Sequence, residues 1–211
     1  KAADAKPAQR TRRRTFVLLG GLVALFAIGA TATMLLREKD APPPYPDMAV
    51  NAWAPYWELP AATASIQAHG STLHQVSPFW YTAKDSITIT YAANITEADT
   101  TEFATAAAAS GATILPSVTD GTASGEMAAI LADPNSRALH IDALMSIARK
   151  YDGIDLDYEG FAFSDPYSTW ETTRPNWVAF VDELAAKLHA EGKLLVVTIP
   201  PVYDTGRTPD S

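Results

Sequence analysis

Residues 151–160 read Tyr-Asp-Gly-Ile-Asp-Leu-Asp-Tyr-Glu-Gly and place three carboxylates at alternate positions, Asp155, Asp157 and Glu159. Successive side chains of a β-strand point to opposite faces, so the three acids share one face if this run is a strand. The opposite face is apolar or aromatic and consists of Ile154, Leu156 and Tyr158. A strand that combines these two faces is expected to be buried, and its acids then serve chemistry rather than stability.

Three like charges along a buried strand face are costly, because each charge loses hydration and repels its neighbours. We therefore expect at least one of the acids, above all Glu159, to hold a proton near neutral pH, as a general acid must. An exposed edge strand would tolerate the charges, but the intervening apolar residues favour burial. A calcium-binding EF-hand loop requires Glu at its twelfth position. The twelfth residue counted from Asp155 is Pro166, which argues against a metal site.

The run from Asp152 to Glu159 resembles the Asp-x-x-Asp-x-Asp-x-Glu motif of family-18 glycoside hydrolases, the chitinase-like enzymes, and matches all four acids. The resemblance implies a (β/α)8 TIM-type barrel whose fourth strand ends in this motif. It implies that Glu159 is the general acid and base that protonates the glycosidic oxygen. Asp157 would orient and polarise the substrate's N-acetyl group, Asp155 would tune Asp157 from deeper in the barrel, and Asp152 would be structural. In this family the substrate's own 2-acetamido group assists, in place of a carboxylate nucleophile.

Strand-like and helix-like segments alternate from residue 48 onward. Strands are expected at residues 48–57, 75–81, 112–118, 151–160 and 194–199, and a hairpin excursion at 86–91. Helices are expected from the cap Thr96 to the stop Gly111, around residues 139–147, and from Pro175 to Gly192. This alternation predicts a parallel sheet with crossover helices, either a barrel or an open doubly wound sheet. No glycine-rich phosphate fingerprint follows these strands, which weakens the nucleotide-binding version.

Eight-stranded barrels typically need about 250 residues. We therefore expect residues 48–211 to supply about five β/α units of the barrel and to be incomplete at the C-terminal side. Active sites in such barrels lie at the C-terminal ends of the strands. Aromatic residues at these ends are candidate sugar contacts, although helix–sheet packing is the alternative for each. The candidates are Tyr56, Trp57, Trp80 and, after the fifth strand, Tyr203. Where the resembled family often carries Ser-x-Gly-Gly, this chain has Ser-Val-Thr-Asp-Gly at residues 117–121.

The start of the chain indicates a membrane segment. Residues 15–36 carry no charge and are mostly apolar, and a bilayer-spanning helix needs about 20 such residues. Arg10 and Arg12–Arg14 precede the segment, as expected on the cytoplasmic side. We expect a basic cytoplasmic tail at 1–14, a transmembrane signal anchor at 15–36, a Pro-rich linker at 37–47 and an extracytoplasmic barrel from 48. Cleavage of the segment as a signal peptide after a small residue is the alternative.

The chain carries a net charge of −8 and no cysteine. Because the basic residues cluster before residue 15, the rest of the chain is strongly acidic, which argues against binding of nucleic acid. The four histidines show no metal-ligand spacing, and we expect neither metal nor cofactor. The leading hypothesis is a glycosidase acting on polysaccharides or oligosaccharides that contain β-linked N-acetylglucosamine. The alternative is a non-catalytic, lectin-like barrel, but such proteins usually lose the proton donor and Glu159 is present.

Overall fold

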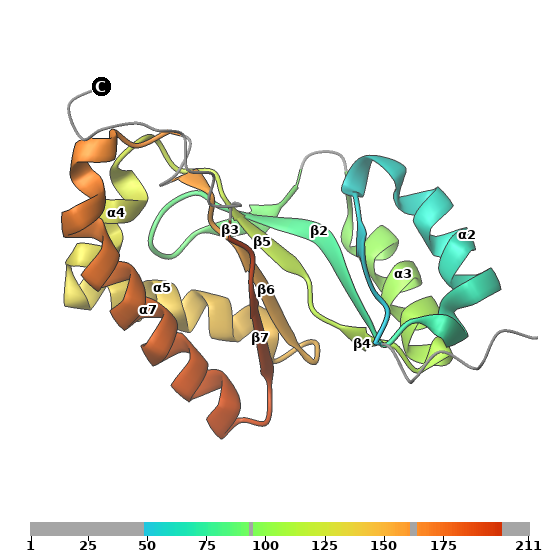
Figure 1. Cartoon of the computed structure of the whole chain (residues 1–211). Helices are drawn as coiled ribbons and strands as arrows, with labels where there is room; N and C mark the ends of the chain where they lie inside the picture. Colours follow the sequence, from blue (N-terminus) through green and yellow to red (C-terminus); the bar gives the residue numbers. More distant parts are fainter. Residues whose placement is uncertain (1–48, 93–94, 161–163, 200–211) are drawn as a thin grey trace, which may run out of the picture. The chain divides into compact units, whose positions relative to one another are not determined.

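A mainly parallel sheet forms the centre of the computed structural model, which describes residues 49–92, 95–160 and 164–199 (Figure 1). Its strands run in the order β1-β2-β5-β6-β7, and each neighbouring pair is parallel. They span β1 (Asn51–Ala54), β2 (Gln75–Ala83), β5 (Ser117–Asp120), β6 (Gly153–Asp157) and β7 (Leu194–Val197). The spatial order follows the chain order without the reversal of a doubly wound sheet. This progression fits a TIM-like barrel and decides between the two expected architectures.

Helices connect the parallel strands and cover one face of the sheet (Figure 1). They span α2 (Leu59–His69), α3 (Glu97–Ser110), α4 (Glu126–Ala132), α5 (Pro134–Ala148) and α7 (Trp170–Ala190), with 3-10 turns at Tyr56–Glu58, Gly70–Thr72 and Tyr167–Thr169. Two short strands complete the sheet: β3 (Ile89–Tyr91) is antiparallel to β2, and β4 (Thr113–Ile114) is parallel to it. The expected hairpin is thus confirmed.

Local sequence signals account for several element ends. Thr96 caps α3 through a capping box with Asp99, and Gly111 ends the helix in the left-handed conformation at φ 83°. Asp133 caps α5 by accepting the backbone N–H groups of Asn135 and Ser136 at 2.6 and 3.1 Å. The expected helices at these places are confirmed, and α5 includes the expected range 139–147 and extends beyond it at both ends.

Several expected boundaries are wrong, and proline accounts for two of the differences. Strand β1 ends at Ala54 rather than residue 57, since Pro55 has no N–H for a ladder hydrogen bond. The strand expected at 112–118 is divided into β4 and β5 around Pro116 for the same reason. Helix α7 begins at Trp170 and contains Pro175 in its interior, so that the 3-10 turn at Tyr167–Thr169, not the proline, leads into it.

The core lies between the sheet and its helices. Strand β6 is buried along its whole length, which excludes an exposed edge strand. Its apolar side chains pack with Leu144 of α5 and with Phe180 and Leu184 of α7, all fully buried. Ion pairs also join α5, or its C-terminal end, to α7: Arg137–Glu183, Lys187–Asp142 and Arg149–Glu191, at 3.0, 2.8 and 2.6 Å. Because these pairs are largely exposed, packing contributes more to stability than they do.

Glycine at position 153 allows β6 and β7 to approach each other closely. A Cβ atom at Gly153 would overlap the backbone oxygen of Leu194, its partner in the parallel register. Any other residue here would push the two strands apart. The glycine of the motif is therefore required by strand packing, not by a turn.

The expected transmembrane segment at residues 15–36 lies outside the described residues. Within residues 49–92, 95–160 and 164–199, no helix combines the length and apolarity needed to cross a bilayer.

Replacing Leu184 with alanine should lower the free energy of unfolding by about 2–5 kcal/mol, because it leaves a cavity between α7 and the sheet. Val178→Ala is the matched control on the same helix, since Val178 is 51% exposed, and should change stability by about 0.5 kcal/mol or less. Urea unfolding followed by circular dichroism measures both values. Equal losses in the two variants would contradict the assigned core.

Candidate active site

The acids of the motif lie at the C-terminal end of β6. Asp155 and Asp157 are in the strand, 0% and 9% exposed, whereas Glu159 is two residues beyond its end and partly exposed. The parallel register places Ser117 beside Asp155 and Thr119 beside Asp157. The exposure of the three acids therefore increases along the chain, from the buried Asp155 to the partly exposed Glu159.

Asp155 is held by three hydrogen-bond donors from three other segments. The indole N–H of Trp53 on β1 and the hydroxyl of Ser117 on β5 both donate to Asp155 Oδ2, each at 2.8 Å. The hydroxyl of Thr198, just after β7, donates to Asp155 Oδ1 at 3.2 Å. A carboxylate accepts such bonds best when it is ionised. The arrangement therefore holds the carboxyl group of Asp155 in one position at the buried end of the three acids.

Asp157 has the opposite environment. Its Oδ1 atom is buried and has no hydrogen-bond partner among the described residues. Burial, and then the charges of Glu159 and Asp155, raise the pKa of Asp157 to about 6. The raised pKa is found at Asp157, and the expected proton on Glu159 stays a prediction.

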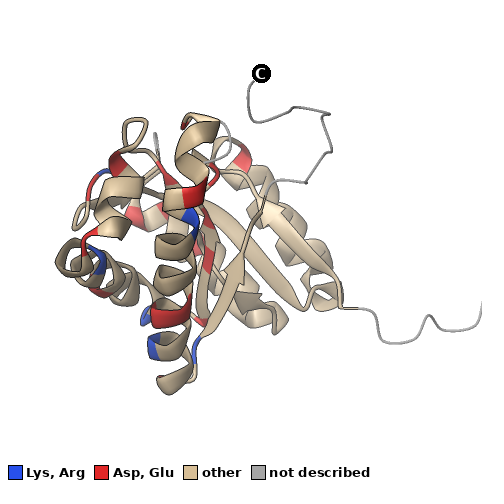
Figure 2. Ribbon diagram, turned by 60° about the vertical axis from the view of Figure 1, so that its left-hand side comes forward, with Lys and Arg blue, Asp and Glu red and all other residues tan. Residues whose placement is uncertain are grey.

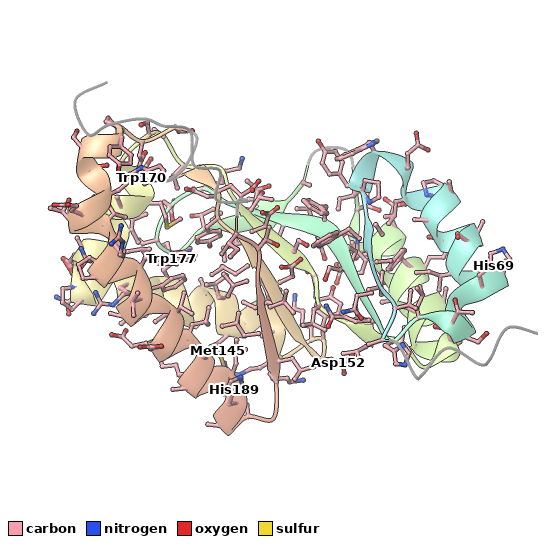
Figure 3. All side chains as sticks on the ribbon, viewed as in Figure 1. His69, Met145, Asp152, Trp170, Trp177 and His189 are labelled. Carbon is pink, nitrogen blue, oxygen red and sulfur yellow. The ribbon has the colours of Figure 1, made fainter. Side chains whose placement is uncertain are left out.

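Asp152 lies at the other end of β6, at the lower edge of the sheet in Figure 3. Its Oδ2 atom accepts the backbone N–H of Ile114 at 2.9 Å. Its backbone N–H and C=O bond to Ile114 and Leu194, on the two neighbouring segments. These contacts are compatible with the structural role implied by the motif.

The expected aromatic contacts lie in different places. Tyr56 and Trp57 follow β1 in a 3-10 turn, with ring centroids 4.9 Å apart and Trp57 65% exposed. Trp80 is 0% exposed and packs against Phe103 and Tyr151, with centroids 5.4 and 5.5 Å apart. The structure therefore does not bring Trp80 to the acids, and its ring takes the helix–sheet packing position. Tyr203 lies outside the described residues.

An irregularity in β2 determines which of its side chains face the acids. The register with β5 shifts between Phe79 and Tyr81, so that Phe79 pairs with Ser117 and Tyr81 with Val118. Because Val118 is on the helix face, Tyr81 turns to that face as well, next to Trp80. The bulge turns Tyr81 away from the face that carries the acids, where alternation from Phe79 would have placed it.

Sequence reasoning missed Trp53, whose ring is 61% exposed on the same face as Asp155. Alternation within β1 could have placed it on that face, but only the sheet register shows that it reaches Asp155.

No group of three or more potential metal-ligating side chains occurs among residues 49–92, 95–160 and 164–199. In Figure 2, acidic residues outnumber basic ones in the upper part of the ribbon.

Several solved structures share this fold. A chitinase from Bacteroides thetaiotaomicron is 19% identical with a TM-score of 0.57, over 72% of this chain and 47% of that one. A chitinase from Cycas revoluta in complex with (GlcNAc)4 is 18% identical with a TM-score of 0.55, over 72% and 46%. The spore cortex-lytic enzyme SleL of Bacillus cereus is 19% identical with a TM-score of 0.55, over 74% and 36%.

The chain spans less than half the length of each of these three structures. No curated protein sequence matches it. The model of the family described as glycosyl hydrolases family 18 matches residues 53–208, which include every strand from β2 to β7 and the whole acidic motif. The chain therefore belongs to glycosyl hydrolases family 18 and contains part of its catalytic domain.

Proposed function

We propose that the protein is a glycosidase that cleaves glycans containing β-linked N-acetylglucosamine, such as chitin-like or peptidoglycan-derived chains. The observation that carries the proposal is the graded set of acids on β6. Asp155 is buried and fully engaged, Asp157 is buried with an unpartnered oxygen, and Glu159 is accessible at the strand end. Family membership and the chitinase fold of the solved structures support the substrate class.

In the proposed mechanism, Glu159 protonates the glycosidic oxygen as the bond to the anomeric carbon breaks. The oxygen of the substrate's own 2-acetamido group attacks that carbon and forms a cyclic oxazolinium ion, so no enzyme carboxylate is the nucleophile. Water then attacks the anomeric carbon and opens the ion. Glu159 acts as a general base in this step and removes a proton from that water. The configuration at the anomeric carbon is retained.

Asp157 has the geometry to assist the acetamido group. Its unpartnered Oδ1 atom can accept the amide N–H of the substrate, which orients the acetamido oxygen towards the anomeric carbon and stabilises the developing positive charge. The three donors on Asp155 hold its carboxyl group in place below Asp157.

We also propose that the apolar segment 15–36 anchors the domain in the cell membrane with the barrel outside. The proposal is supported by the uncharged segment and the arginines before it. An extracytoplasmic location would give the domain access to envelope or environmental glycans.

Glu159→Gln in the full-length protein should lower the turnover of a fluorogenic chitooligosaccharide by about 100-fold or more, because the amide cannot donate the proton that the leaving oxygen needs. Binding of the oligosaccharide, measured by calorimetry, should persist. Glu126→Gln is a matched control, since Glu126 is an exposed residue in the first turn of α4. Unchanged turnover in Glu159→Gln would refute the proton-donor assignment. If the wild type and Glu159→Gln both bind the oligosaccharide and neither turns it over, the lectin-like alternative is favoured.

The raised pKa of Asp157 predicts a pH-dependent stability. A carboxyl group with a folded-state pKa of about 6 and an ordinary value of 3.8 holds its proton more tightly in the folded state. The wild type should therefore lose stability relative to Asp157→Asn as the pH rises from about 4 to about 6, and the difference should be constant above that range. Urea unfolding at a series of pH values measures this difference. A flat difference across the range would contradict the raised pKa.

The anchor proposal predicts that the protein stays in the membrane fraction after an alkaline carbonate wash, while the barrel remains open to protease added outside intact cells. In the matched comparison, residues 1–36 are replaced with a cleavable signal peptide, and the barrel should then be released in soluble form. Release of the wild-type protein itself would show that the segment is cleaved.

A further inference from the structure

Tyr158 separates Asp157 and Glu159 in the chain but points to the opposite face of the sheet. Its ring is 3% exposed and stacks on Phe180 of α7, with centroids 6.1 Å apart and planes 8° from parallel. The ring of Trp177, labelled on α7 in Figure 3, lies on its periphery with a centroid distance of 6.3 Å. Because Tyr158 lies between Asp157 and Glu159 in the chain, the position of its ring affects the backbone of both acids.

The hydroxyl of Tyr158 bonds to a buried histidine. His140 of α5 is 0% exposed, and its Nε2 atom is 2.6 Å from the Tyr158 hydroxyl oxygen. Its Nδ1 atom is 3.2 Å from the backbone oxygen of Ser86. A carbonyl oxygen can only accept, so Nδ1 carries the hydrogen and Nε2 accepts the hydroxyl hydrogen. Burial lowers the pKa of His140, in agreement with this neutral form.

The Ser86 carbonyl belongs to a fixed turn between β2 and β3. Asp85 Oδ1 accepts the backbone N–H groups of Ile87 and Thr88 at 2.8 and 2.7 Å. The bonds through His140 therefore connect three segments: this turn, helix α5 and the end of β6. Only the last of these carries the acids.

The backbone on the other side of Glu159 is also confined. A Cβ atom at Gly160 would lie 2.9 Å from Asp120 Oδ2, closer than real Cβ contacts allow. Asp120 is itself held, because its Oδ1 accepts the N–H and the hydroxyl of Thr122 at 2.9 and 2.7 Å. Both neighbours of Glu159 thus touch fixed polar groups.

We propose that His140 is a positioning residue for the general acid Glu159, acting through the hydroxyl of Tyr158. The inference rests on the proposed function of Glu159. Glu159 lies two residues beyond β6, where the parallel ladder no longer fixes its height. The hydrogen bond to Tyr158 fixes the preceding residue instead. A general acid displaced by about 1 Å from the leaving oxygen can lose about 100-fold in rate.

The decisive comparison is Tyr158→Phe against Tyr151→Phe in the full-length protein. Each change removes one hydrogen-bonded hydroxyl, from the buried Tyr158 or from the half-buried Tyr151. The Tyr151 hydroxyl bonds to the Tyr81 hydroxyl at 3.2 Å, near the other end of β6. Both variants should lose similar stability in thermal unfolding. Tyr158→Phe should lower kcat on a chitooligosaccharide by about 10- to 100-fold with KM within about twofold, whereas Tyr151→Phe should leave both unchanged.

Variants of the histidine test the same link from its other side. His140→Leu removes the acceptor and should lower kcat as Tyr158→Phe does, while the double variant should be no slower than either single one. His140→Gln, whose amide oxygen can accept the Tyr158 hydroxyl, should recover part of the rate. A purely structural role would instead make the rate follow stability across these variants, which would overturn the proposal.

The outcomes separate this inference from the proposed function. Absence of turnover in the wild type, or full turnover in Glu159→Gln, would overturn the proposed function and the inference with it. Turnover that requires Glu159 but is the same in Tyr158→Phe and Tyr151→Phe would overturn the inference alone.

Discussion

The hydrogen bonds to Asp155 are the constraint on which the site depends. Their donors come from β1, β5 and the residue after β7, so the carboxylate is a meeting point for strands that are far apart in the chain. Trp53 and Asp155 are separated by 102 residues, and only a curved parallel sheet brings them within 2.8 Å. The contact has two effects, because it joins the strands and also fixes the position of the most deeply buried of the three acids. Chemistry and folding are therefore coupled at one buried group.

This coupling explains why adjacent acids differ so much. Asp155 and Asp157 are on the same strand, two residues apart, yet one is surrounded by donors and the other has a buried oxygen without a partner. In a parallel sheet the side chains of one layer come from neighbouring strands at the same height, so each layer can have its own polarity. The layer of Asp155 contains donors, whereas the layer of Asp157 leaves its Oδ1 atom without a partner among the described residues. The different hydrogen-bond environments of Asp155 and Asp157 are therefore a property of the layers, not of the motif alone.

Local features of the sequence predicted the elements and the acidic strand. Alternation identified β6, and the cap at Thr96 and the stop at Gly111 identified α3, because these signals act within a few residues. The sequence did not predict Trp53 as a donor to Asp155 or the bond between His140 and Tyr158, and it left Trp80 open between a sugar contact and helix–sheet packing. Each depends on tertiary arrangement: Trp53 reaches Asp155 from another strand, Trp80 packs on Phe103 of α3, and His140 meets Tyr158 through the packing of α5 on β6. Such contacts arise from tertiary arrangement and have no signal of fixed spacing.

Gly153 also has a consequence for the opposite end of its strand. Its missing side chain permits the pairing of Gly153 with Leu194, and the same parallel ladder then brings Thr198 level with the acids. Because the glycine has no side chain, β6 and β7 can approach closely and pair in this alignment. A methyl group at this base would be transmitted along β7 as a displacement of the Thr198 hydroxyl. A substitution at Gly153 would therefore disturb the alignment of the site, although the glycine lies at the opposite end of the strand from Glu159.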